Sequence, residues 1–114
     1  MPLHYNLAKV YELSDNDPEF ALSIVGLFLE EVPPEVKHIK EGIEDNDHEK
    51  VYQAAHKIKP TLDLLGLFTA YENNQKIMQW TKDKGQRKAI IEIYKELKQQ
   101  VDDAAKEIKK DFNI

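Results

Sequence analysis

The sequence contains no cysteine among its 114 residues. This absence excludes a disulfide framework, a thiolate zinc site, an iron–sulfur cluster and a cysteine nucleophile. A chain without disulfides is typical of the reducing cytoplasm, and we therefore expect a cytoplasmic location.

Long hydrophobic runs and an excess of basic residues are also absent. No segment approaches the ~18 apolar residues of a membrane span, and residues 1–6 lack the basic region of a secretory signal. The 16 Lys and Arg residues are outnumbered by 21 Asp and Glu residues, so the net charge is −5. Because a nucleic-acid binder usually needs a basic face to displace counterions, we expect neither a nucleic-acid nor a membrane partner.

Glycine and proline, which interrupt regular structure, number only 4 and 5. The chain is rich in helix-compatible residues, with 41% hydrophobic and 32% charged side chains, and this composition disfavours an all-β sandwich. A length of 114 residues is typical of one domain. We therefore expect a single domain over residues 1–114.

Hydrophobic periodicity predicts helices over nearly the whole chain. Asp17 followed by Pro18 is typical of a helix start, and Pro33-Pro34 is expected to end or kink a helix. Apolar residues at three- and four-residue spacing predict an all-α antiparallel bundle. Helices are expected over Leu7–Leu13, from Pro18 to Val32, over a more polar segment with Val36, Ile39 and Ile43, from a cap at Asn46 or Asp47 onward, over Phe68–Lys82 and over Gln86–Lys110.

One histidine lies outside the apolar stripe of its helix. At about 100° per residue, His56 is about 140° from the centre of the stripe, so we expect it to face solvent. Most single histidines have no special role, but an outward imidazole on a helical backbone is accessible and largely neutral at pH 7. These properties suit a nucleophile that attacks phosphorus. The stripe consists of Val51, Ala55, Ile58, Leu62 and Leu65.

A distinctive local pattern follows His56 and consists of Lys59, Pro60 and Gly66. Lys59 lies one turn on, where its ammonium can meet anionic oxygens attached to the imidazole. Pro60 has no N–H to donate to the carbonyl of His56, so it bends the helix there or ends it at Lys59. The stripe keeps its phase across Pro60, which favours a kinked but continuous helix. Gly66 is explained equally well as the residue that ends this helix.

The run from Ala54 to Leu67 resembles the signature of the histidine phosphotransfer (HPt) domain. That signature is His-x-hydrophobic-Lys-Gly followed by a glycine ten residues after the histidine, and here His56, Lys59 and Gly66 match it. The upstream order of an Asp-Pro-Glu-Phe helix start, a proline break and an aspartate turn is similar too. The resemblance implies a four-helix bundle with a short additional N-terminal helix. It also implies that His56 accepts and donates a phosphoryl group through Nε2, while Lys59 stabilises the phosphate.

Two positions depart from the pattern of the family. Pro60 replaces the small glycine that usually follows the lysine, but it is compact, so we expect reactivity to survive. Met78 stands where the family often has a Gln or Glu that orients the histidine. Gln75 is the best substitute and Gln79 the next, although solvated helix positions explain both of them equally well.

The resemblance also implies the partners of the protein. These are receiver domains of response regulators and of hybrid histidine kinases, which would bring the phosphoaspartate and Mg²⁺. We therefore expect this domain to need no cofactor or metal of its own, and we expect it to be a monomer. Leu64 has core packing as an alternative role. The expected docking residues around His56 are Tyr52, Lys57, Pro60, Asp63, Leu64, Gly66 and Leu67.

Three other interpretations compete with a phosphoryl carrier. A di-iron bundle needs inward Glu-x-x-His pairs, and the one such pair, Glu35 to His38, places His38 away from the apolar face. A degenerate HPt domain would dock receivers as an adaptor without carrying phosphate. A nucleic-acid patch on the last helix is disfavoured, because its lysines alternate with acidic residues as on a solvated face.

Overall fold

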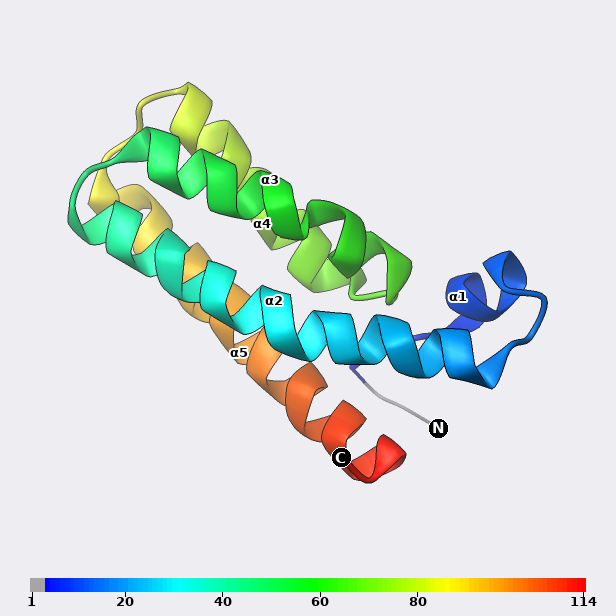
Figure 1. Cartoon of the computed structure of the whole chain (residues 1–114). Helices are drawn as coiled ribbons and strands as arrows, with labels where there is room; N and C mark the ends of the chain where they lie inside the picture. Colours follow the sequence, from blue (N-terminus) through cyan, green and yellow to red (C-terminus); the bar gives the residue numbers. More distant parts are fainter. Residues whose placement is uncertain (1–3) are drawn as a thin grey trace.

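The computed structural model describes residues 4–114, and this part of the chain forms five α-helices and no strand. In Figure 1, α2, α3, α4 and α5 form an elongated bundle, while α1 lies beside the start of α2. The molecule extends over about 43 × 23 × 20 Å. The expected all-α fold, a four-helix bundle with a short N-terminal helix, is therefore confirmed. The bounds are α1 Ala8–Leu13, α2 Pro18–Glu44, α3 His48–Leu64, α4 Phe68–Lys82 and α5 Arg87–Phe112.

The core lies where the apolar stripes of the four long helices meet. Each helix packs against its two neighbours in the ring, α2 on α3 and α5, and α4 on α3 and α5. Helical residues spaced three and four apart share one face, so each stripe is withdrawn from water along the whole helix. The largest fully buried side chains include Phe28, Ile39, Ile43, Ile58, Leu62, Leu65, Ile77, Ile90, Leu97 and Ile108.

The second helix continues through Pro33 and Pro34, so the expected division into two helices is wrong. The two prolines lie away from the core, and the carbonyls that lose their helical donors belong to the half-exposed Leu29 and the exposed Glu30. Water can therefore hydrogen-bond to these carbonyls. Meanwhile the buried stripe keeps its phase across the dipeptide, with Val32 at 0% and Val36 at 4% exposure, and its packing holds the helix together.

Helix α3 also runs without interruption through its proline, Pro60, as the phase of its stripe predicted. Its N-cap is Asp47, whose carboxylate accepts a hydrogen bond from the Lys50 backbone N–H at 3.1 Å. The alternative cap, Asn46, lies outside the helix in the left-handed region at φ 55°. The last helix begins one residue later and ends two residues later than expected.

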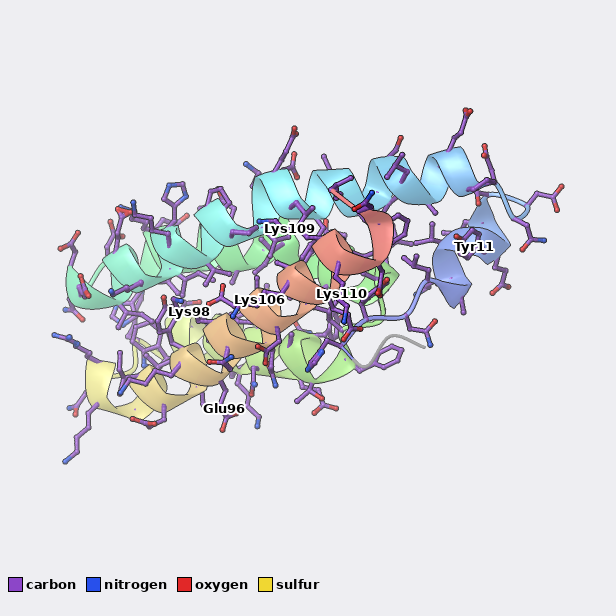
Figure 2. All side chains as sticks on the ribbon, turned by 90° about the horizontal axis from the view of Figure 1, so that it is seen from below. Tyr11, Glu96, Lys98, Lys106, Lys109 and Lys110 are labelled. Atoms are coloured by element: carbon purple, nitrogen blue, oxygen red, sulfur yellow. The ribbon has the colours of Figure 1, made fainter. Side chains whose placement is uncertain are left out.

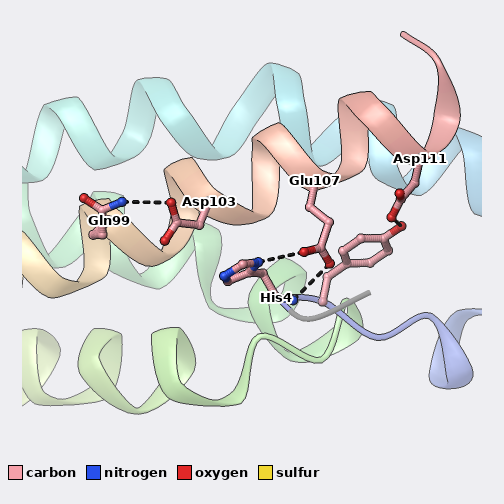
Figure 3. A network of polar contacts seen from close by, with 6 residues as sticks. His4, Gln99, Asp103, Glu107 and Asp111 are labelled. Carbon is pink, nitrogen blue, oxygen red and sulfur yellow. Dashed lines mark hydrogen bonds and ion pairs between the residues drawn. The ribbon is translucent and has the colours of Figure 1, made fainter. Parts of the chain in front are cut away.

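Residues 4–7 cross the end of the bundle and bind to α5 and to the α3–α4 turn. His4 contacts Glu107 through its backbone N–H (3.0 Å) and its Nδ1 (2.7 Å), as Figure 3 shows. The Tyr5 hydroxyl donates to Asp111 at 2.8 Å, and the Asn6 N–H donates to the Leu65 carbonyl at 2.7 Å. The N-terminal segment is therefore attached both to α5 and to the turn that ends α3.

The outer face of α5 carries lysines among acidic side chains. Figure 2 shows Lys98, Lys106, Lys109 and Lys110 along this helix. Lys98 is paired with Asp102 at 2.7 Å, and this hydrogen bond is the main cause of the raised pKa of Lys98. Mixed charges of this kind are typical of a solvated helix face.

Candidate functional site

His56 lies in the middle of α3 with its side chain exposed to solvent. The stripe residues on the opposite face, Val51, Ala55, Ile58 and Leu62, are all 1% exposed or less. The helical-wheel prediction for this histidine is therefore confirmed. Because buried packing and helical hydrogen bonds hold the backbone on either side, the imidazole projects from a rigid support.

The imidazole of His56 is stacked on the ring of Tyr52, one turn earlier on α3. The two ring centroids are 5.7 Å apart and the planes meet at 30°. Within the described residues, 4–114, this stacking is the only ring contact of His56, and neither ring nitrogen has a hydrogen-bond partner. Both nitrogens are therefore available to a group arriving from solvent.

The two lysines beside His56 differ in their partners. The ammonium of Lys57 lies 3.7 Å from a carboxylate oxygen of Glu35 on α2, a residue that also pairs with His38 at 3.1 Å. Lys59 is half-buried, and its ammonium has no ion-pair or hydrogen-bond partner in the described part of the chain. Lys59 is therefore the better placed of the two to meet a phosphoryl group on His56.

The expected docking residues differ in exposure. Pro60 is exposed, whereas Tyr52, Asp63 and Leu64 are half-buried. The carboxylate of Asp63 is paired with the ammonium of Lys9 on α1 at 2.9 Å, so this acidic group already has a partner within the chain. These four residues remain on or near the surface that carries His56.

Leu67 is the exception, because it is only 4% exposed and belongs to the core. Its expected place in the docking surface is therefore wrong. The wheel of α3 does not extend to Leu67, since Gly66 turns the chain in the left-handed region at φ 68° and Leu67 begins α4 as its N-cap. Gly66 ends the helix as the alternative interpretation held.

Gly66 also permits the close approach of the N-terminal segment. A Cβ atom at this position would lie 2.7 Å from the Cβ of Asn6 and 3.0 Å from its carbonyl oxygen. The residue is half-buried by this contact. Its requirement for glycine is therefore explained twice over, by the backbone angle and by Asn6.

The helix that follows supplies no hydrogen bond to His56 among the described residues. Met78 is 7% exposed, and the side-chain oxygen of Gln75 is buried without a hydrogen-bond partner. Gln79 is exposed and donates to Asp83 at 3.0 Å. The expected role of Gln75 in orienting His56 is thus unsupported by contact in this structure.

Sequence reasoning missed the role of Asn74, a fully buried residue of α4. Its side-chain amide donates to the backbone carbonyl of Ala55 at 2.8 Å. This bond ties the turn that carries His56 to α4, directly before Pro60 removes the helical donor of the His56 carbonyl. A polar residue at an apolar stripe position was the available signal, but its partner 19 residues away was not visible in the sequence.

No group of three or more His, Cys, Asp or Glu side chains is placed to hold a metal ion within residues 4–114. Glu35 and His38, the pair considered for a di-iron bundle, contact each other at the outside of α2, and His38 is exposed. Within the same residues no helix has the length and apolar character needed to cross a membrane.

The comparison with protein families identifies the class of this fold and site. The model of the Hpt domain family matches residues 23–107, which covers α3, α4 and most of α2 and α5. The chain therefore belongs to the Hpt domain family, whose members are phosphocarrier modules of two-component phosphorelays and interact with receiver domains. The comparisons with curated proteins and with solved structures found no match.

Proposed function

We propose that His56 accepts a phosphoryl group from the aspartate of one receiver domain and passes it to the aspartate of another. The observation that carries this proposal is the exposed imidazole in the middle of α3, with both ring nitrogens unpartnered among the described residues. A phosphoryl group needs in-line access to a nitrogen lone pair, and the exposure of His56 leaves its ring nitrogens accessible from solvent.

The transfer step needs no further reactant besides the two domains. Neutral His56, with its proton on Nδ1, attacks phosphorus through the Nε2 lone pair. The Nε2–P bond forms while the P–O bond to the donor aspartate breaks, and the aspartate leaves as a carboxylate. The ring becomes a cationic phosphoimidazole that keeps its Nδ1 proton, and transfer to the second receiver reverses these steps.

Charge stabilisation is divided between this domain and its partner. Phosphoryl transfer depends mainly on positioning and on neutralising the phosphoryl oxygens. Lys59 would supply one cation from this side, since its ammonium is unpartnered within the described residues. The receiver would bring Mg²⁺ with its phosphoaspartate, so we propose that this domain acts as a carrier without a cofactor or metal of its own.

We propose that the receiver docks across the outer edge where α2 meets α3. Lys57, the residue after His56, forms an ion pair with Glu35 of α2, so the side of α2 that carries Glu35 lies next to the surface of α3 that carries His56. On α2, Leu27 lies within about 80° of Glu35 around the helix and is 41% exposed. Leu64 is half-buried and lies seven residues after Lys57, about 20° from it around the helix and so on the side of α3 that pairs with α2. Apolar contact with the receiver would come from these two leucines.

We also propose that the domain acts as a monomer in the cytoplasm.

The test follows a labelled phosphoryl group from a receiver domain, in the presence of Mg²⁺, onto this chain. We expect label that is labile in acid and stable in alkali, as phosphohistidine is, and that is absent from His56→Gln. His38→Gln is the matched control, because His38 is also an exposed histidine within a long helix, and this variant should take up label like the unchanged protein.

Two results would contradict the proposal that His56 carries the phosphoryl group. If receivers bind this chain without transferring label, the domain is an adaptor. If His56→Gln is still labelled, the phosphoryl acceptor is another residue.

A further inference from the structure

The His56 imidazole contacts an aromatic ring of its own helix, α3, and has no hydrogen bond from α4 among the described residues. Tyr52 stacks on the ring at 5.7 Å and 30°, within the range of about 4.5–7 Å over which aromatic rings attract each other. Neither Gln75 nor Met78 of α4 bonds to the imidazole among the described residues. Tyr52 is therefore the side chain that restricts how the imidazole can turn.

Stacking is compatible with the chemistry of the ring. The lone pair of an imidazole nitrogen lies in the plane of the ring, whereas a stacked partner covers one face. Tyr52 therefore limits rotation of the His56 ring and leaves its two nitrogens open at the edge. A ring held in this way presents Nε2 in a restricted direction, and such restriction lowers the entropy loss of reaching an in-line arrangement.

Tyr52 is itself held in place. It lies four residues before His56 on the same rigid helix, and its side chain is half-buried. It borders a groove of about 300 Å³ between the start of α3 and the end of α4, which is also lined by His48, Thr81 and Lys82. On its other side Tyr52 packs against the hydrophobic core, and this packing limits the positions that the tyrosine ring can adopt.

We propose that Tyr52 is a positioning residue for phosphoryl transfer, and that its ring orients the His56 imidazole by stacking where Gln75 and Met78 form no hydrogen bond to it. This inference rests on the proposed function of His56 as the phosphoryl acceptor. Tyr52 touches no reacting atom and acts through the face of the imidazole. The aromatic ring is the required feature, and the tyrosine hydroxyl is dispensable.

The first arm of the test examines the stacking without any transfer. The ring protons of His56 in the full chain are followed by NMR in Tyr52→Phe, which keeps an aromatic ring, and in Tyr52→Leu, which keeps bulk without one. We expect the ring-current shift on the His56 protons to remain in Tyr52→Phe and to disappear in Tyr52→Leu. Tyr11→Leu, which removes a half-buried tyrosine on α1, is the control and should leave the His56 signals in place. Unchanged His56 signals in Tyr52→Leu would overturn the proposal.

The second arm separates positioning from docking. Transfer from a phosphorylated receiver is measured over a range of receiver concentrations. In Tyr52→Leu we expect the rate constant at saturation to fall about tenfold with an unchanged half-saturating concentration, and Tyr52→Phe to restore it to within about twofold. A raised half-saturating concentration with an unchanged saturating rate would show that Tyr52 only docks the receiver, and would overturn the proposal.

A small phosphodonor, phosphoramidate, checks that the variants remain chemically competent. It needs no docked geometry, so His56 in all three proteins should take up phosphate from it at equal rates. If the unchanged chain accepts no phosphoryl group from any receiver, the proposed function fails. The NMR arm then still decides whether Tyr52 orients His56.

Discussion

At the scale of the residue, His56 differs from the other histidines of the chain in having no polar partner. His4 pairs with Glu107, His38 pairs with Glu35, and the Nε2 of His48 lies 2.8 Å from the carbonyl of Gly85. Within the described residues only the imidazole of His56 combines exposure with two free ring nitrogens. Its neighbours on α3 therefore leave it available for an external group.

The neighbouring lysines supply a residue-scale prediction. We expect Lys59→Ala to slow transfer from a phosphorylated receiver by about tenfold, because about 1.4 kcal/mol of transition-state stabilisation corresponds to a factor of ten. Lys57→Ala is the matched control and should change the rate less, since its ammonium already faces Glu35. Rates are measured by single-turnover transfer of label. Because Lys59 is half-buried, circular dichroism should first confirm that both variants keep their helix content.

An equal loss of rate in the two variants would contradict this difference in role. It would indicate that the receiver senses the summed positive charge of the surface. Raised salt would then slow transfer in the unchanged protein by screening that charge.

At the scale of the element, the periodicity of apolar residues predicts most of the fold. α4 has the expected bounds, and α3 continues across Pro60 as its stripe required. The error at Pro33-Pro34 has a physical cause. A local rule treats proline as a helix breaker, whereas buried packing on both sides and access of water to the outer carbonyls sustain α2 through the dipeptide.

Glycine substitutions test the end of α3. We expect Gly66→Ala to lower the free energy of unfolding by about 1–2 kcal/mol or more, because a Cβ is strained at φ 68° and would lie 2.7 Å from the Cβ of Asn6. Gly26→Ala is the control, since it lies inside α2 with nothing within 4 Å of the added Cβ. That change should stabilise the protein by about 0.5–1 kcal/mol. Urea unfolding, followed by the fluorescence of Trp80, measures both.

The two glycine variants should therefore differ in sign. If Gly66→Ala is as stable as the unchanged chain, both the left-handed backbone angle at Gly66 and the packing of Asn6 on this turn are contradicted.

At the scale of the whole molecule, hydrogen bonds between distant segments join the N-terminal segment to α5 and α4 to α5. The Tyr5 hydroxyl donates to Asp111, 106 residues later, and Asn73 of α4 donates to Glu96 and Gln100 of α5. Burial, followed by the hydrogen bond and charge of Asp111, raises the pKa of Tyr5. Burial likewise raises the pKa of Tyr94. Folding therefore favours the neutral form of both tyrosines.

These shifts predict a loss of stability in alkali. A tyrosine in the unfolded chain loses its proton near pH 10, whereas Tyr5 in the folded chain keeps it to higher pH. The stability contributed by neutral Tyr5 is fully present below about pH 10 and is lost as the pH rises further, by up to about 1.4 kcal/mol per pH unit for one proton. We expect Tyr5→Phe to be less stable at pH 8, because the bond to Asp111 is lost, but to lose stability more slowly above pH 10.

Urea unfolding of both proteins between pH 8 and pH 11.5 measures this difference. Titration of the lysines affects the two chains alike and cancels in the comparison. Parallel curves above pH 10 would mean that Tyr5 is not protected in the folded state.

The sequence by itself determined the helices, their buried faces and the exposure of His56, because helical periodicity is a local property that repeats every 3.6 residues. The family signature of His56, Lys59 and Gly66 is equally local. For the same reason the wheel failed at Leu67, which lies beyond the turn where α3 ends.

Only the tertiary structure decided which groups meet across elements. Asn74 donates a hydrogen bond to the Ala55 carbonyl, and Asn6 packs on Gly66. Glu35 forms an ion pair with Lys57, while Lys59 has no partner within the described residues. These partners are up to 60 residues apart, and their meeting depends on how the helices pack and turn rather than on local pattern. Even the stacking of Tyr52 on His56, though only four residues apart, depends on side-chain orientations that spacing alone leaves open.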